Sequence, residues 1–453
     1  MLLLKKVSLI SLGCAKNQVD SEVILGNLKY YGYQLTSDEQ AADVIIINTC
    51  GFIEDAKEES IDTILQVGKL KELDNAKTLV VCGCLSQRYK EELKVEIPEI
   101  DLLLGIDQWD KMGIILNRYF EGKPVTEGFL LKDYLYSHES PRIPLDLTEY
   151  KGTAYIKIAE GCDNHCSYCA IPLIRGNYRS RSIESIKKEA ERLAKAGVKE
   201  INLIAQETTR YGLDYYGEYK LTELLQELTK IPELTWIRFL YGHPARIDQK
   251  LIAIIAEEDK ICPYLDLPLQ HINDKMLKRM NRKGSKNEVK LLIDKLRKAI
   301  PDVVLRTSFM VGFPGEKEED FKELLDFIKE IKFDYVGIFK YSKEENTPAA
   351  ELDGEVDEGT KDERYKLATE LQQKITREKR SYWTGKTFEV LVDSTLQEEA
   401  SSYLARTKYQ APEVDGSVII PDSRMEVGSF AKVKITQIIE NDLIGEINYE
   451  SGK

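Results

Sequence analysis

Alternating apolar runs and helical patterns organise the first part of the chain. The runs that predict strands are rich in β-branched residues and lie at residues 7–12, 43–48, 79–81 and 101–104. Short apolar strands separated by helices are typical of a parallel sheet with crossover helices. We therefore predict an N-terminal parallel-sheet α/β domain over residues 1–140.

A second set of alternating elements follows a stretch without period at residues 135–147, which we interpret as a linker. Strand patterns occur at residues 154–159, 200–205, 236–241, 264–267, 303–311 and 334–339. Helical patterns separate them at residues 183–196, 221–230, 249–257, 287–299 and 318–331. Six βα units predict a partial (βα)6 barrel over residues 148–378, with chemistry at the carboxyl ends of its strands. The open side of such a barrel would admit a large substrate.

The last segment changes to short alternating strands. An acidic, glycine-bearing stretch at 351–364 predicts a connection, and residues 362–379 have a helical pattern. Strand patterns then occur at residues 388–392, 403–407, 417–420, 431–437 and 443–447. They predict a small C-terminal β-barrel over residues 380–450, a shape often used to bind macromolecules.

Composition limits the class of protein. No apolar run approaches the roughly 20 residues of a membrane span, and the first residues lack the features of a signal peptide. We therefore expect a cytoplasmic protein, in which cysteines are more commonly metal ligands than partners in disulfides. The net charge of −13 argues against a general binder of nucleic acid.

Three cysteines lie within eight residues, in a C-x3-C-x2-C spacing formed by Cys162, Cys166 and Cys169. They follow a predicted strand, and Ser182 is the expected N-cap of the next long helix. A zinc site would need a fourth ligand, and His165 is a poor candidate because its ring would compete with the thiolates for one face. An iron–sulfur cluster with one open iron fits three ligands better. The alternative is that these cysteines are small buried hydrophobes.

Three further cysteines each follow a strand of the N-terminal domain. Cys14, Cys50 and Cys84 end the first three strands, and the carboxyl ends of parallel strands meet at one edge of a sheet. The pattern predicts a second three-cysteine cluster site. Cys82 alternates with Cys84 and is an ambiguous neighbour, while the sequence gives no role for Cys262.

With Tyr168 before its last cysteine, the C-x3-C-x2-C motif resembles the radical S-adenosylmethionine (SAM) superfamily. The whole chain resembles its methylthiotransferase family, which has an N-terminal three-cysteine domain, a radical-SAM partial barrel and a C-terminal TRAM barrel. The matching motifs are Ser11-Leu-Gly-Cys14-Ala-Lys-Asn17, Asp20-Ser-Glu22, Asn48-Thr-Cys50-Gly-Phe-Ile53 and Gly83-Cys84-Leu85.

This resemblance implies a site and a chemistry. Cys162, Cys166 and Cys169 would hold a [4Fe–4S] cluster that binds SAM and yields a 5′-deoxyadenosyl radical, and Cys14, Cys50 and Cys84 a second, auxiliary [4Fe–4S] cluster that carries the transferred sulfur. The family's pattern also suggests SAM contacts, with structural roles as the alternative, from Tyr168, Gln206, Glu207, Gln270 and Arg306. A substrate carboxylate would need a cationic partner, for which Lys16 and Arg175 are candidates that the sequence does not separate.

The family has two branches, which differ in substrate. One modifies an adenosine of transfer RNA, and the other an aspartate of the twelfth small-subunit ribosomal protein. The motif after Cys50 and the stretch from Arg406 to Gly416 resemble the ribosomal-protein branch. Residues 384–453 carry seven basic and twelve acidic side chains, a balance that would repel RNA and attract a basic protein.

Other functions stay open at this point. The acidic barrel is also compatible with a merely solvated surface, and transfer RNA is the nearest rival substrate. A non-enzymatic protein whose fold is stabilised by bound metal would have closed four-ligand sites. An electron-transfer protein would not need a full barrel. The resemblance also implies an electron donor such as flavodoxin or ferredoxin.

Overall fold

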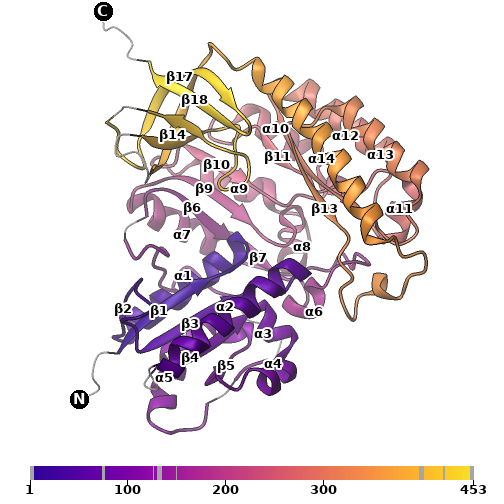
Figure 1. The fold of residues 1–453 in the computed structure, drawn as a ribbon. Helices are drawn as coiled ribbons and strands as arrows, with labels where there is room; N and C mark the ends of the chain where they lie inside the picture. Colours follow the sequence, from indigo (N-terminus) through magenta and orange to yellow (C-terminus); the bar gives the residue numbers. More distant parts are fainter. Residues whose placement is uncertain are drawn as a thin grey trace, which may run out of the picture.

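The structure, a computed structural model, describes residues 5–73, 77–125, 127–129, 135–148, 150–396, 402–421 and 424–448. Its three parts follow one another along the chain, and the middle part separates the N-terminal part from the C-terminal barrel (Figure 1). Among the described residues, no helix combines the length and the apolar character that crossing a membrane requires.

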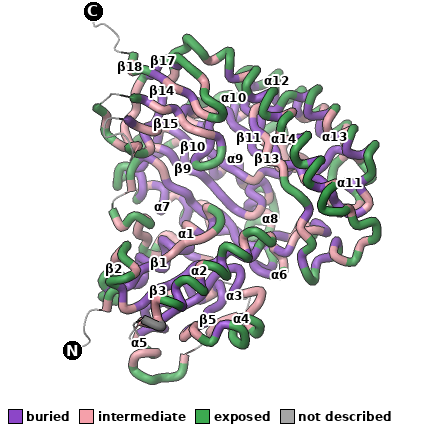
Figure 2. The backbone as a smooth tube through the Cα atoms, in the orientation of Figure 1, coloured by how far each residue is buried: buried purple, intermediate pink, exposed green. Residues whose placement is uncertain are grey.

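The N-terminal part is a five-stranded parallel sheet in the order β2-β1-β3-β4-β5. All six residues of β3 and of β4 are buried, because helices cover both faces of the sheet (Figure 2). The predicted strands are confirmed, and only the two-residue strand β2 was not expected. The elements are β1 (Lys6–Ser11), α1 (Ala15–Tyr30), β2 (Gln34–Leu35), β3 (Val44–Thr49), α2 (Glu54–Leu73), β4 (Thr78–Gly83), α3 (Cys84–Arg88), α4 (Lys90–Glu96), β5 (Leu102–Leu103), η1 (Ile106–Lys111) and α5 (Met112–Phe120).

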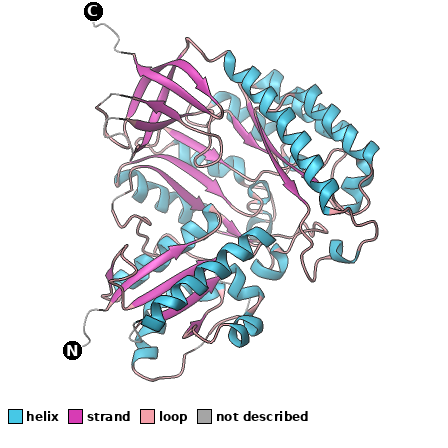
Figure 3. Cartoon of the chain, in the orientation of Figure 1, coloured by secondary structure: helices cyan, strands magenta, loops and turns pink. Residues whose placement is uncertain are grey.

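The middle part contains the six predicted strands as two parallel sheets, β10-β9-β6 and β11-β12-β13. A bridge between Ile237 and Ile261 joins the two sheets into one arc. Helices cover its outer face (Figure 3). The elements are β6 (Gly152–Lys157), β7 (Ala159–Glu160), α6 (Ile171–Arg175), β8 (Arg179–Ser180), α7 (Ile183–Lys195), β9 (Val198–Ile204), η2 (Thr208–Arg210), α8 (Leu213–Tyr216), α9 (Leu221–Thr229), β10 (Trp236–Phe239), η3 (Pro244–Arg246), α10 (Gln249–Glu257), β11 (Tyr264–Asp266), α11 (Asp274–Arg279), α12 (Lys286–Ala299), β12 (Val304–Val311), α13 (Glu318–Ile331), β13 (Tyr335–Lys340), η4 (Pro348–Glu351) and α14 (Glu358–Ser381).

The connection predicted at residues 351–364 is too long. Helix α14 already begins at Glu358, because the Asp357 side chain accepts a hydrogen bond from the Thr360 amide at 2.9 Å and caps the helix. The sequence prediction weighted glycine and acidic content and missed this cap. The predicted cap of α7 is confirmed, since Ser182 accepts from the Ser185 amide.

The C-terminal part is a closed five-stranded barrel in the order β14-β15-β16-β18-β17, as predicted. It packs on the amino-terminal ends of the middle part's strands. There the Arg406 side chain pairs with Glu200 of β9 at 2.8 Å, and Asp415 pairs with Arg306 of β12 at 3.4 Å. The strands are β14 (Thr387–Thr395), β15 (Tyr403–Thr407), β16 (Val418–Ile420), β17 (Phe430–Ile439) and β18 (Asp442–Ile447).

The N-terminal part lies against both edges of the six-stranded arc. On one edge, Lys157 of β6 pairs with Asp20 of α1. On the other edge, Glu344 after β13 pairs with Arg88 of α3 at 2.5 Å and with Lys57 of α2 at 3.3 Å. The open side that we expected to admit a large substrate is therefore covered by the N-terminal part of the same chain.

Candidate functional site

The C-x3-C-x2-C loop leaves the barrel at the carboxyl end of β6. The antiparallel pair β7 and β8 closes the base of the loop, and the Cys162 amide donates to the Gly176 carbonyl at 3.1 Å. Cys162 and Cys166 are buried, whereas His165 is exposed. The backbone of His165 has a positive φ of 50°. Burial raises the pKa of the Cys162 thiol to about 11 and that of Cys169 to about 12. The loop therefore gathers three thiols and leaves the histidine outside.

Glu207 supports this loop from the end of β9. Its carboxylate accepts hydrogen bonds from Asn164 at 2.7 Å and Thr209 at 2.7 Å, and pairs with Arg246 at 2.9 Å. The same Asn164 amide group donates to the Cys162 Sγ at 3.5 Å. Glu207, which we predicted as a SAM contact, thus holds the cysteine loop through Asn164.

Arg282 is a cation beside the loop that sequence reasoning missed. Its Nη1 lies 3.7 Å from the Cys166 Sγ and 3.4 Å from the Tyr168 hydroxyl, and its Nη2 donates to the Pro268 carbonyl. No sequence signal marks it, because Arg282 follows α11, more than a hundred residues after the cysteines. It places positive charge beside Cys166, where a thiolate would be stabilised.

The other predicted SAM contacts lie at different levels of the barrel. Gln206, at the carboxyl end of β9, donates to Glu160 at 2.7 Å, while its own Oε1 is buried without a hydrogen-bond partner. Gln270 follows β11 at a positive φ of 71°. Arg306 lies nearer the amino-terminal ends, where its guanidinium pairs with Asp266 at 3.2 Å and with Asp415 of the C-terminal barrel. These internal partners favour a structural role for Arg306.

The three cysteines of the N-terminal part meet at the carboxyl edge of its sheet. Cys14 is the N-cap of α1, Cys50 follows β3, and Cys84 begins α3. A Cβ on Gly13, which has a φ of 89°, would lie 2.9 Å from the Cys50 Sγ, so only glycine permits this approach. Burial raises the pKa of the Cys50 thiol to about 12, and the neighbouring Cys84 and Cys14 thiols add to the shift.

The two remaining cysteines are buried in hydrophobic cores. Cys82 is fully buried in the core of the N-terminal part, packed with Trp109, and Cys262 is buried within the core that β10 and β11 share with the C-terminal barrel. The structure thereby separates Cys82 from Cys84, whose Sγ instead accepts a hydrogen bond from Arg175 at 3.1 Å.

Arg175 links the second cysteine group to the barrel through a buried charge network. From α6, its guanidinium reaches Asn17 at 2.7 Å, Asp20 at 2.9 Å and Glu160 at 3.3 Å. Lys157 pairs with the same two carboxylates. Burial works to raise the pKa of Glu160, but Lys157 and Arg175 outweigh it and hold that pKa at about 2. The network docks the N-terminal part on the barrel beside both cysteine groups.

Lys16 differs from Arg175 in its surroundings. Its ammonium lies 3.2 Å from the centre of the Tyr241 ring, and Tyr241 follows β10 at a positive φ of 63°. Within the described ranges, no carboxylate lies within ion-pair distance of Lys16. Burial works to lower its pKa, but Tyr241 and Cys14 outweigh this effect and raise it.

Both cysteine groups fit a cluster better than a single ion. In the part of the chain that the structure describes, no three Cys, His, Asp or Glu side chains converge on one ion position. Cysteines of an iron–sulfur cluster each bind a different iron, so their sulfurs need not converge on one point. Each group also supplies only thiols, and a thiol that coordinates a metal is deprotonated.

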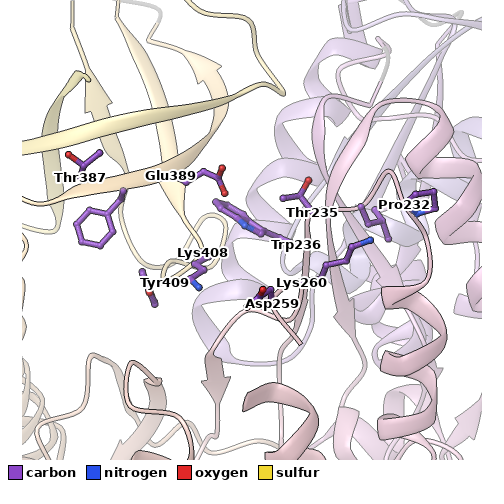
Figure 4. A pocket seen from close by; sticks show the side chains of 11 residues that line it. Pro232, Thr235, Trp236, Asp259, Lys260, Thr387, Glu389, Lys408 and Tyr409 are labelled. Carbon is purple, nitrogen blue, oxygen red and sulfur yellow. The ribbon is translucent and has the colours of Figure 1, made fainter. Parts of the chain in front are cut away.

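A cavity lies elsewhere, between the middle part and the C-terminal barrel (Figure 4). It measures about 630 Å³ and is lined by Trp236 and Thr235 at the start of β10, by Thr387 and Glu389 of β14, and by Lys408. Because it opens at the amino-terminal ends of the barrel strands, it is on the face opposite to the cysteines. We do not assign the reaction to it.

Three family models match the chain. They are "Uncharacterized protein family UPF0004" over residues 6–105, "Radical SAM superfamily" over residues 156–328 and "TRAM domain" over residues 384–447. The chain is 51% identical to "Ribosomal protein uS12 methylthiotransferase RimO" of Natranaerobius thermophilus, covering 98% of this chain and 99% of that protein. The protein of the same name from Clostridioides difficile is 47% identical, with coverage of 98% and 99%.

Solved structures support the fold. The radical SAM methyltransferase TsrM from Kitasatospora setae superposes with a TM-score of 0.55 at 15% identity, covering 77% of each chain. The cobalamin-dependent SAM radical enzyme OxsB gives a TM-score of 0.51 at 14% identity and covers 83% of this chain and 56% of that one.

Proposed function

The chain belongs to the family of radical SAM methylthiotransferases named for ribosomal protein uS12, and on this premise we propose that it transfers a methylthio group to an aspartate β-carbon of uS12. Its relatives carry that name at about half identity over nearly the whole chain. A cytoplasmic location and an electron donor of the flavodoxin or ferredoxin class complete the proposal, because the reaction needs reduced thiols and a one-electron donor.

We propose two cluster sites. Cys162, Cys166 and Cys169 would hold one [4Fe–4S] cluster, and Cys14, Cys50 and Cys84 the other. When bound, the clusters and SAM would supply radical initiation at the first site and the sulfur to be transferred at the second. SAM would lie at the carboxyl end of the barrel strands, near Tyr168 and Gln270.

The chain's own residues would position these groups. Asn164 and Glu207 fix the conformation of the first cysteine loop, and Arg282 faces its thiols. Arg175 contacts the second cysteine group through Cys84 while it stays anchored to Glu160 of the barrel. One side chain of the substrate would enter between the two groups, because the N-terminal part covers the open side of the barrel.

The observation that supports the proposal most is that Arg175, which contacts Cys84 of the second group, is anchored to Glu160, two residues before Cys162 of the first group. A binding protein stapled by metal would need closed four-ligand sites, and neither group supplies a fourth ligand among the described residues. The acidic C-terminal barrel favours uS12 over transfer RNA, because it would repel a phosphate backbone. Its buried Arg406 is committed to Glu200 and Asp393 and does not add to an RNA-binding surface.

The test uses anaerobically reconstituted protein. We expect about eight irons per chain and, after incubation with SAM, reductant and uS12, a uS12 product heavier by one methylthio group on an aspartate. The triple variant Cys14→Ser, Cys50→Ser, Cys84→Ser should keep about four irons and lose the transfer. The matched control Cys262→Ser should keep both iron and transfer. Modification of transfer RNA alone would assign the chain to the other branch, and redox-silent zinc would exclude the enzyme.

A further inference from the structure

We propose that the Lys16 ammonium binds the side-chain carboxylate of the aspartate to be modified, an inference that rests on the proposed function. The other buried cations between the N-terminal part and the barrel already have acidic partners. Arg175 and Lys157 share Asp20 and Glu160, and Arg88 pairs with Glu344. Lys16 is 9% exposed, and none of the acidic residues that the structure describes lies within ion-pair distance of it.

Burial removes water from the ammonium, and the Tyr241 ring and the Cys14 sulfur offset that cost. A ring is not a carboxylate, however, and a charged hydrogen bond to an anion would stabilise the ammonium further. The fold nevertheless keeps this lysine in place. We infer that its missing anion is supplied by a ligand.

The position of the ammonium specifies that ligand. Lys16 is two residues after Cys14 on α1, and it reaches across to Tyr241, which follows β10 at the carboxyl edge of the barrel. It therefore lies between the auxiliary cysteine group and the rim where the radical is generated in the proposed function. A substrate aspartate held there would present its β-carbon to both groups.

A second role would place the same charge opposite the thiolates of Cys14 and its neighbours. The two roles differ in what they predict for the substrate. A carboxylate partner makes binding depend on the substrate's negative charge, because replacement by an amide leaves the ammonium unpaired. If Lys16 instead pairs with the thiolates, substrate binding does not depend on the negative charge of the substrate.

The experiment is a double-mutant cycle of binding affinity, measured on anaerobically reconstituted protein without reductant. Two forms of the protein are compared, the wild type and Lys16→Met. Each is tested with two substrates, uS12 and uS12 in which asparagine replaces the target aspartate. For the wild-type protein, we expect the asparagine substrate to bind about 10- to 100-fold more weakly. For Lys16→Met, both substrates should bind with that weaker affinity. Lys16→Arg, which keeps the charge, should restore part of the discrimination.

Lys29→Met is the matched control, because Lys29 is exposed at the other end of the same helix. It should discriminate between the two substrates like the wild type. Equal discrimination by the wild type and Lys16→Met would overturn the inference while leaving the proposed function intact. A change of cluster absorption or iron content in Lys16→Met, with discrimination unchanged, would also overturn it, in favour of the thiolates. Failure of the wild-type protein to bind or modify uS12 would instead contradict the proposed function.

Discussion

At the scale of single residues, the site depends on charges that are buried because they are shared. Arg175 contacts Asn17, Asp20 and Cys84 from the N-terminal part and Glu160 from the barrel. The carboxylates of Asp20 and Glu160 would be costly to bury without a cationic partner. One arginine therefore couples the conformation of the second cysteine group to the barrel that carries the first.

Replacing this arginine should weaken the whole docking. Arg175→Met leaves Lys157 alone with two buried carboxylates, so we expect a loss of about 3–5 kcal/mol in the free energy of unfolding. Chemical denaturation measures it, and Arg118→Met, at an exposed arginine of α5, should change stability by less than about 1 kcal/mol. A loss of that smaller size in Arg175→Met would show that solvent enters the interface and replaces the ion pairs.

His243 predicts a pH dependence of stability. Burial, with Arg282, Arg246 and Lys283 adding to it, lowers the pKa of His243 to about 2 in the folded chain, whereas the unfolded pKa is about 6.5. The unfolded chain thus binds more protons below pH 6.5, so this part of the stability is present above that pH and is lost as pH falls. Between pH 6.5 and 5.5 we expect a loss of about 1 kcal/mol.

Denaturation curves at several pH values test this dependence. In the wild type, the Ala245 amide donates a hydrogen bond to the His243 Nδ1 at 3.2 Å. The His243→Asn variant keeps a polar side chain near that amide. Its stability should fall less steeply between pH 6.5 and 5.5 than that of the wild type. Identical slopes of stability against pH for the two proteins would mean that His243 binds a proton as readily in the folded chain as in the unfolded chain.

At the scale of elements, the contact between α2, α3 and the segment after β13 keeps the N-terminal part against the barrel edge. Glu344 is buried and pairs with both Arg88 and Lys57. Arg88 also donates to the Gly51 carbonyl, directly after Cys50. The contact therefore holds a cysteine-bearing loop as well as the interface.

Removing the Glu344 charge should open this edge. In Glu344→Gln, Arg88 and Lys57 lose their shared anion, and the two cations are best stabilised by exposure to water. We expect a larger radius of gyration by small-angle scattering with unchanged helix content. Glu345→Gln is the control, because Glu345 is exposed and its bond with Tyr89 contributes little. Equal radii for both variants would show that other contacts suffice to keep the edge closed.

Sequence patterns predicted elements where the signal is local. The strands of the barrel follow from β-branched apolar runs, and α13 was predicted with the bounds that the structure has. The six cysteines stand out because cysteine is rare and each follows a strand or belongs to one spaced motif. Arg282, Asn164 and Arg246 could not be found in this way, since their contacts arise only when distant segments pack. The SAM contacts of Tyr168, Glu207, Gln270 and Arg306 stay predictions.

At the scale of the whole molecule, the C-terminal barrel inserts charged side chains into the amino-terminal end of the larger one. Arg406 is buried between Glu200 of β9 and Asp393 of β14, and it donates to the Thr153 hydroxyl at 3.0 Å. Phe430 of β17 packs edge-on against Trp236, with ring centres 4.8 Å apart. The barrel thus closes the end of the core opposite to the two cysteine groups.

This docking predicts the effect of removing one guanidinium. Arg406→Met leaves Glu200 with Arg238 alone at 3.1 Å and leaves Asp393 without its arginine. We expect the melting temperature to fall by several degrees, since breaking a buried pair costs about 3–5 kcal/mol, and Trp236 to shift its emission to the red as water reaches it. Arg424→Met, an exposed arginine of the same barrel, should leave both unchanged. A lower melting temperature of Arg406→Met with an unchanged emission wavelength of Trp236 would contradict this expectation. The guanidinium would then stabilise β9 and β14 separately, and the aromatic contact alone would dock the barrel.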